Sequence, residues 1–307
     1  RFANLPAWTY APHYIDDLAG FEGLRLHYID EGPQDAPATF LCLHGEPSWS
    51  YLYRKMLPVF TAAGFRVVAP DWFGFGRSDK AVKDEVYTFA FHRNTLAAFL
   101  DRMALSNVCL VVQDWGGLLG LTIPKDYPQV TRVLVMNTGI GVGISPGAGF
   151  NAWKAYVASH PDMDVGALMK RSTPILTESE KAAYGAPFPD ITYKAGVRRF
   201  PQLVPVDPAM EGVDQGRASV EFFRERWNGQ SFMASTGLWA VQLTDGVCVD
   251  TSACVQVVST GAGTTSGLDI IDTTCPIVTR AQRYGQKFVR DGWHVVIFGD
   301  PGHKEVR

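Results

Sequence analysis

Short apolar runs alternate with amphipathic stretches between Leu24 and Thr138, and this alternation constrains the fold more than any other feature of the 307-residue chain. Each run is rich in Val, Leu or Phe, as buried strands are. Strands that alternate with helices form a mostly parallel sheet with helices on both faces, and functional residues gather at the carboxyl ends of the strands. The predicted strands are residues 39–43, 65–69, 108–113 and 133–137, and the predicted helices are residues 51–63, 92–103 and 117–127.

The remainder of the chain differs in texture. From Gly139 to Asp214 the β-rich runs give way to helical stretches broken by prolines, which predicts a helical cap inserted after a strand. A strand resumes at residues 232–234. We therefore expect an α/β core over residues 1–138, a cap over 139–214, a return to the core over 215–234, a low-charge junction over 235–267 and a second α/β piece over 268–307.

The segment 235–267 has an unusual composition. Asp245 and Asp250 are the only charged residues among its 33, and Ser, Thr and Gly account for 15 of them. It shows no amphipathic period and has little capacity to form a packed helix. Because the chain also starts at Arg1 rather than at a methionine, we expect a fragment.

Charge and apolar content exclude several classes of partner. The 28 basic and 31 acidic residues give a formal charge of −3, so no basic excess exists to bind nucleic acid. The apolar runs are far shorter than the ~20 residues that span a bilayer, and no signal-peptide pattern opens the chain. Five cysteines without framework spacing are typical of reduced thiols. We expect a cytoplasmic monomer that binds neither nucleic acid nor membrane.

Asp114 ends the predicted strand 108–113 and precedes a predicted helix. This is the position of a nucleophile elbow, with Asp where other hydrolases carry Ser. Gly116 and Gly117 allow the tight turn that presents the side chain, and the helix N-terminus would keep a carboxylate ionised. The alternative is that Asp114 only caps the helix, a common role of Asp.

Two further loops follow predicted strands. The sequence His-Gly-Glu-Pro at 44–47 comes directly after the first strand, where a backbone N–H can complete an oxyanion hole. The sequence Asp-Trp-Phe-Gly-Phe-Gly-Arg-Ser at 71–78 follows the next strand. It lacks the spacing of a dinucleotide-binding fingerprint, and we interpret it as loop punctuation.

At these residues the chain resembles the α/β-hydrolases, and among them the haloalkane dehalogenases. The shared motifs are the segments 44–50, 71–78, 113–117, Ala-Pro-Phe-Pro-Asp at 186–190 and Trp-Asn-Gly-Gln at 227–230, so the likeness covers about residues 1–234. The resemblance implies an α/β-hydrolase core with a mostly parallel sheet and an inserted helical cap. Here that fold is followed by an atypical C-terminal segment.

The resemblance also implies hydrolysis of haloalkanes to alcohol and halide, with no metal and no organic cofactor. Asp114 would displace halide from an sp³ carbon, and a histidine-activated water would hydrolyse the resulting aspartyl ester. A carboxylate suits this role because it needs no deprotonation at neutral pH. The implied partners are a small halogenated hydrocarbon, water and a halide ion.

Four other residues match site positions of that family. Trp115 matches the first halide donor and Trp153 the second, and two indole N–H groups can hold a halide without a countercharge. Phe150 matches an apolar wall residue, and Glu46 belongs to the oxyanion loop. Ordinary packing within the cap is the alternative for Trp153.

The resemblance breaks after Ala234, where the family continues with a strand and then a catalytic acid. No acid is in register here. Asp245 is the nearest candidate, and Asn137 can orient a histidine but cannot neutralise its positive charge, so the third triad member stays unassigned. His303 follows a predicted strand, as the base of an α/β-hydrolase does, and is our candidate for that base.

Residues 268–307 resemble a second family, the iron–sulfur reductase that converts hydroxymethylbutenyl diphosphate. Cys275 would match one cluster ligand and His303 a diphosphate contact. The other two cysteine motifs are absent, and one thiolate does not hold a cluster. We hypothesise a fusion or mis-joined reading frame whose altered C-terminus impairs hydrolysis.

Three alternatives remain open at this point. An epoxide hydrolase of the same fold would need cap tyrosines aimed at the pocket, and Tyr156, Tyr184 and Tyr193 are available. The chain can instead be an inactive fusion product or a fragment of the iron–sulfur reductase.

Overall fold

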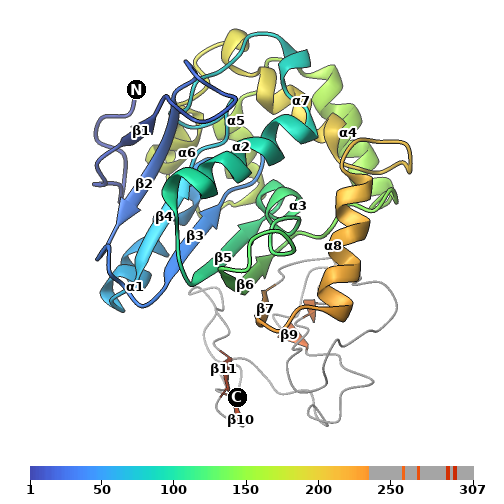
Figure 1. Ribbon diagram of the computed structural model, residues 1–307. Coiled ribbons are helices and arrows are strands. Elements are labelled where there is room, and N and C mark those ends of the chain that lie inside the picture. The colour runs from blue at the N-terminus through green and yellow to red at the C-terminus, as the bar shows by residue number, and fades with distance from the viewer. Residues whose placement is uncertain (235–257, 260–267, 270–287, 291–292, 296–307) are drawn as a thin grey trace.

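Figure 1 shows the computed structural model of the chain. It describes residues 1–234 and four short strands beyond them, in which β8 pairs with β9 and β10 with β11. His303, Cys275 and Asp245 lie outside the described residues, as does most of the predicted junction and reductase-like piece. The four strands are β8 (Val258–Ser259), β9 (Leu268–Asp269), β10 (Phe288–Arg290) and β11 (Trp293–Val295).

A seven-stranded sheet forms the core, in the order β1-β2-β4-β3-β5-β6-β7. The pairings of β1 with β2 and of β2 with β4 are antiparallel, and the others are parallel, so the mostly parallel sheet is confirmed. The strand order reverses between β3 and β5, and ligands bind at such switch points. The strands are β1 (His13–Ile15), β2 (Leu26–Glu31), β3 (Thr39–Leu43), β4 (Arg66–Pro70), β5 (Val108–Gln113), β6 (Val130–Met136) and β7 (Gln230–Ala234).

The helices of the core differ from the predicted ones at two prolines. The predicted helix 51–63 is divided into η1 (Ser50–Tyr53) and α1 (Leu57–Ala62), because Pro58 has no N–H and fits only the first turn of a helix. The predicted helix 117–127 is the shorter α3 (Trp115–Gly120), since Pro124 cannot donate the bond that would extend it. The remaining core helices are η2 (Asp84–Val86) and α2 (Phe89–Met103).

Helices also fill the segment predicted to be the cap. They lie together in the upper half of Figure 1, and α8 (Val213–Glu225) leads the chain back to β7. The predicted boundary at residue 214 falls in the first turn of α8. The other cap elements are α4 (Ala148–Ser159), α5 (Val165–Ser172), α6 (Glu178–Gly185), η3 (Ile191–Tyr193) and α7 (Ala195–Leu203).

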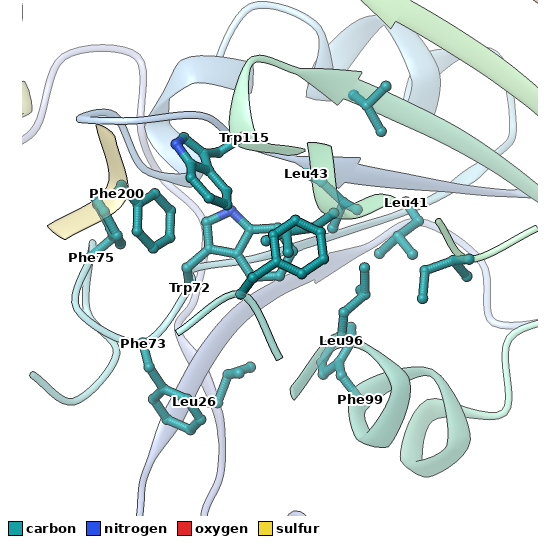
Figure 2. Close-up of a cluster of buried hydrophobic side chains, with 14 of the residues drawn as sticks. Leu26, Leu41, Leu43, Trp72, Phe73, Phe75, Leu96, Phe99, Trp115 and Phe200 are labelled. Carbon is teal, nitrogen blue, oxygen red and sulfur yellow. The ribbon is translucent and has the colours of Figure 1, made fainter. Parts of the chain in front are cut away.

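Phe200, on α7, joins the cap to the core. Its side chain is fully buried, and its ring lies 4.4 Å from Trp115, 4.5 Å from Phe75 and 4.5 Å from His92. In Figure 2 Phe200 lies between Phe75 and Trp115. Phe200 of the cap and Trp115, the residue that follows Asp114, therefore belong to the same buried apolar cluster.

Two buried histidines make the fold sensitive to acid. Burial lowers the pKa of His92 to about 3 and that of His44 to about 4. Neither ring nitrogen of His92 has a hydrogen-bond partner within the described part of the chain. In the unfolded chain both histidines titrate near pH 6.5. Below that pH the unfolded state therefore binds protons at these two side chains, and the folded state does not. Stability is therefore complete above about pH 6.5 and falls as the pH drops towards 4.

We expect His92→Phe to reduce this acid sensitivity. The variant should recover about 3 kcal/mol of the stability lost between pH 6.5 and 4, since one pKa unit corresponds to about 1.4 kcal/mol. Urea unfolding at several pH values measures the effect. His160→Phe is the control, because His160 lies exposed on the cap. Equal pH dependence in His92→Phe and the unchanged chain would contradict the assignment.

Two observations concern the expected reduced thiols and the expected lack of a membrane-spanning segment. Cys42 and Cys109 are buried and free, and the other three cysteines lie outside the described residues. Within the part of the chain that the structure describes, no helix is long and apolar enough to cross a bilayer.

Candidate active site

Asp114 lies in a sharp turn between β5 and α3. Its backbone has φ 50° and ψ −120°, a conformation that residues with a side chain rarely adopt. Its side chain makes no capping hydrogen bond to α3, although it stands at the N-cap position. The alternative that Asp114 serves only as a helix cap is therefore wrong, because its carboxylate accepts the Glu46 N–H of a distant loop.

Glycines make room for this turn. A Cβ on Gly116 would collide with the carbonyl group of Leu43, and a Cβ on Gly117 would collide with the side chain of Thr138. On the other side, a Cβ on Gly45 would lie 2.6 Å from Asp114 Oδ1. The small residues after Asp114 therefore have the role predicted for them, whereas the need for Gly45 follows only from the tertiary contact.

The Asp114 carboxylate is held by backbone amides. The Glu46 N–H donates to Asp114 Oδ1 at 2.7 Å, and the Trp115 amide also lowers the pKa of Asp114. Burial outweighs both donors, so the pKa of Asp114 lies above its ordinary value. The sequence predicted that the helix N-terminus would keep the carboxylate ionised, and the loss of water on burial opposes that effect.

The Glu46 side chain adds a second carboxyl group to this site. Burial first, and then the charge of Asp114, raise the pKa of Glu46 well above its ordinary value. Its Oε1 is buried with no hydrogen-bond partner within residues 1–234. Both effects shift the equilibrium of the Glu46 carboxyl towards its neutral form.

Trp115 opens α3 with a buried side chain. Its ring is packed against Phe200 at 4.4 Å and lies 6.2 Å from Phe89. Within the described residues its indole N–H donates no hydrogen bond, and Figure 2 places the indole nitrogen on the side away from Trp72. A buried N–H donor beside Asp114 is therefore free to bind an anion.

Trp153 and Phe150 both lie on α4, half-buried against the main apolar cluster. Trp153 stacks on Tyr156 with ring centroids 5.8 Å apart. No ring contact joins Trp153 to Trp115 among the described residues, but α4 packs on α7, which carries Phe200. Trp153 and Phe150 therefore lie on a cap helix that packs on α7. The Phe200 ring of α7 in turn contacts Trp115.

Hydrogen bonds join the loop after β3 to the loop after β4. His44 is buried, and its Nε2 accepts the Trp72 N–H at 3.1 Å while Trp72 Nε1 donates to the His44 carbonyl at 2.8 Å. Asp71 is fully buried, and its carboxylate lies 2.7 Å from His27 Nδ1. The segment 71–78 is therefore more than loop punctuation, because Asp71 ties three segments together. The sequence signal for this role was the position of Asp71, a carboxylate that follows a predicted strand.

The remaining candidates follow β6 or lie outside the described residues. Asn137 follows β6 with φ 44°, and its N–H donates to the Ala234 carbonyl at 3.3 Å. Thr138, which sequence reasoning missed, donates its hydroxyl to the Asp114 carbonyl. His303 lies outside the described residues, so the catalytic base stays a prediction and the third triad member stays unassigned.

Comparison with known proteins agrees with this geometry. Residues 38–230 match the family described as alpha/beta hydrolase fold. A haloalkane dehalogenase of Psychrobacter cryohalolentis is 47% identical over 224 residues, which are 71% of this chain and 73% of the relative. One of Mycolicibacterium paratuberculosis is 43% identical over 246 residues, 77% of this chain and 79% of the relative.

A solved structure supports the same relationship. The tetrameric haloalkane dehalogenase of Paraglaciecola agarilytica NO2 has a TM-score of 0.74 and 50% identity, covering 76% of this chain and 78% of that protein. The monomer that we expected for the present chain stays a prediction.

The C-terminal part matches a different family. Residues 233–307 match the LytB protein family, which confirms the predicted resemblance to the diphosphate reductase. The match begins within β7, immediately after the hydrolase match ends. Up to that junction the fold, the aspartate elbow and the relatives agree, and the chain belongs to the haloalkane dehalogenases, hydrolases that act on carbon–halide bonds within the α/β-hydrolase fold.

Proposed function

We propose that this chain dehalogenates small haloalkanes through an ester on Asp114, and that its altered C-terminus impairs the hydrolytic half of the reaction. The carrying observation is the Asp114 carboxylate, which makes no capping hydrogen bond to α3 and accepts the Glu46 N–H at 2.7 Å. The next residue, Trp115, has an indole N–H that donates no hydrogen bond within the described residues.

The first step is a displacement at carbon. The Glu46 N–H already occupies Asp114 Oδ1, so Oδ2 is the oxygen that attacks. The new O–C bond forms as the carbon–halogen bond breaks, and the halide leaves with the bonding electron pair. The Trp115 N–H, with that of Trp153, stabilises the leaving halide as its charge develops.

The second step is hydrolysis of the ester. Water attacks the Asp114 carboxyl carbon while a base takes its proton. Charge then develops on Oδ1, where the amides of Glu46 and Trp115 can stabilise it. Collapse breaks the ester C–O bond, and the hydroxyl proton of the intermediate passes to the departing alkoxide, which gives the alcohol and restores the carboxylate. The protonated base releases its proton to solvent. His303 is the proposed base, and without a properly placed base the ester persists.

Incubation of the full chain with 1-bromobutane tests both halves. We expect one equivalent of bromide, and mass spectrometry should find one butyl group on the peptide that contains Asp114. Release through many turnovers would show that a base operates, and would refute the impairment. A folded protein that releases no bromide and carries no adduct would refute the nucleophile assignment.

Replacing Trp115 with Phe should slow the first step. We expect single-turnover bromide release to fall about 10²- to 10³-fold, the usual loss for one donor to a developing anion. Trp227→Phe is the matched control, because the Trp227 indole N–H donates to Ser231 Oγ at 2.9 Å instead. An unchanged rate in Trp115→Phe would exclude the indole as a halide donor.

The described contacts give the epoxide hydrolase little support. The Tyr184 hydroxyl accepts a hydrogen bond from Arg54 at 3.0 Å within the second apolar cluster. Tyr193 lies under the guanidinium of Arg1, and Tyr156 stacks between Trp153 and His160. Arg54 thus engages the hydroxyl of Tyr184, whereas the contacts of Tyr156 and Tyr193 involve their rings. The relatives named above are haloalkane dehalogenases, which favours dehalogenation over epoxide hydrolysis.

A further inference from the structure

A surface groove of about 720 Å³ lies where the N-terminal segment, the loop after β4 and η3 of the cap meet. Its walls carry four basic side chains, and none of its residues belongs to the turn around Asp114. The basic residues are Arg1, Arg25, Arg77 and Lys80.

Several arginines elsewhere in the described chain are paired with carboxylates. Arg66 forms a two-pronged pair with Asp30 at 2.8 and 2.7 Å. Arg198 contacts Asp84 in the same way at 3.3 and 2.7 Å. Such fork-to-carboxylate pairing is the usual way a guanidinium is satisfied.

The arginines of the groove lack such pairing. The Arg77 guanidinium reaches only the Phe2 carbonyl, at 3.4 Å, and its Nε has no partner within residues 1–234. Arg25 lies 3.8 Å from Asp79 and is about half exposed. Much of the positive charge around the groove is therefore not neutralised by the described residues.

Three aromatic rings fix these guanidinium groups. Arg1 lies 4.9 Å from the ring centroid of Tyr193, Arg77 lies 4.9 Å from Phe2, and Arg25 lies 4.7 Å from Tyr14. A guanidinium held over a ring keeps the N–H groups at its edge available for an anion in its plane.

Lys80 has a lowered pKa in this basic groove. Its ammonium donates to the carbonyls of Phe75, Gly76 and Ser78 at 3.2, 2.7 and 2.9 Å. Burial, with a contribution from the charge of Arg1, nevertheless lowers the pKa of Lys80 to about 8. The neighbouring carboxylates are Asp71 and Asp79, which raise the pKa of Lys80, and Asp190, which interacts with Arg1. These three are fewer than the four cations.

We propose that this groove binds a small ligand through a phosphate group, which the guanidinium edges of Arg25 and Arg77 contact. The three terminal oxygens and double negative charge of a phosphate group match several donors better than a single carboxylate does. The groove is lined by both the core loop and η3 of the cap. A bound phosphate therefore connects the two and stabilises the folded chain.

Calorimetric titration of the full chain with inorganic phosphate tests the proposal, with sodium chloride keeping the ionic strength constant. We expect saturable binding and a rise in the unfolding temperature that chloride alone does not produce. Phenyl phosphate should bind more tightly than inorganic phosphate if the aromatic walls contribute, and equally if the phosphate group alone is recognised.

Arg25→Gln and Arg77→Gln should each weaken phosphate binding about tenfold, the loss expected for one charge-assisted contact. Arg102→Gln is the control, because Arg102 is exposed on α2 and does not line the groove. Unchanged affinity in the variants, or a thermal shift that chloride reproduces, would overturn the proposal. Should Arg77→Gln fail to fold, the exposed Arg25 decides alone. No haloalkane is present, so the result is independent of dehalogenation.

Discussion

Replacing Asp114 with Asn is expected to abolish both bromide release and the butyl adduct. The amide is isosteric with the carboxylate, and its oxygen can still accept the Glu46 N–H, but it lacks the nucleophilic charge. Loss of a covalent nucleophile reduces rates by on the order of 10⁴- to 10⁶-fold. Bromide assays and intact mass, recorded under single-turnover conditions with 1-bromobutane, measure the loss.

Asp35→Asn controls for the change of charge, because Asp35 is exposed in the loop before β3. It should leave the yield of adduct unchanged. A butyl adduct of undiminished yield in Asp114→Asn would show that another side chain is alkylated. Urea unfolding of both variants verifies that they are folded, since removing a buried charge can itself change stability.

Phe200→Ala should have the largest effect on stability. The fully buried ring is packed against Trp115, Phe75 and His92, so truncation leaves a cavity between cap and core. Buried Phe→Ala substitutions cost about 3–5 kcal/mol. We also expect slower alkylation, about tenfold or more, because the Trp115 ring loses the neighbour that fixes its orientation.

Phe60→Ala separates these two effects. Phe60, on α1, stacks on Phe40 at 4.1 Å, far along the chain from the cap. Its truncation should lower stability without slowing alkylation by the folded protein. Urea unfolding and single-turnover bromide release, compared for the two variants, test the distinction. Equal alkylation rates in Phe200→Ala and Phe60→Ala would show that the cap contact does not position Trp115.

Local patterns predicted much of the core. The apolar run of β5 followed by Asp114 and two glycines is read within ten residues, and the observed strand ends where it was expected. By contrast, β6 begins at Val130, three residues before the predicted start. Arg132 is polar and joins the sheet because Cys109 of β5 and Gln230 of β7 pair with it on either side, whereas Thr131 lies at a shift in the β5–β6 register.

The sequence by itself determined the alternating α/β layout, the helical cap and Asp114 as the nucleophile candidate, because each depends on residues close together in the chain. It also indicated the change of family after Ala234, which the LytB match confirms. Only the tertiary structure decided that the Glu46 amide, 68 residues away, holds Asp114, and that Phe200 of the cap packs on Trp115. The electrostatics belong to the tertiary structure too. Burial by distant segments raises the pKa of Asp114 and Glu46, and loss of water is a property of packing that no local pattern contains.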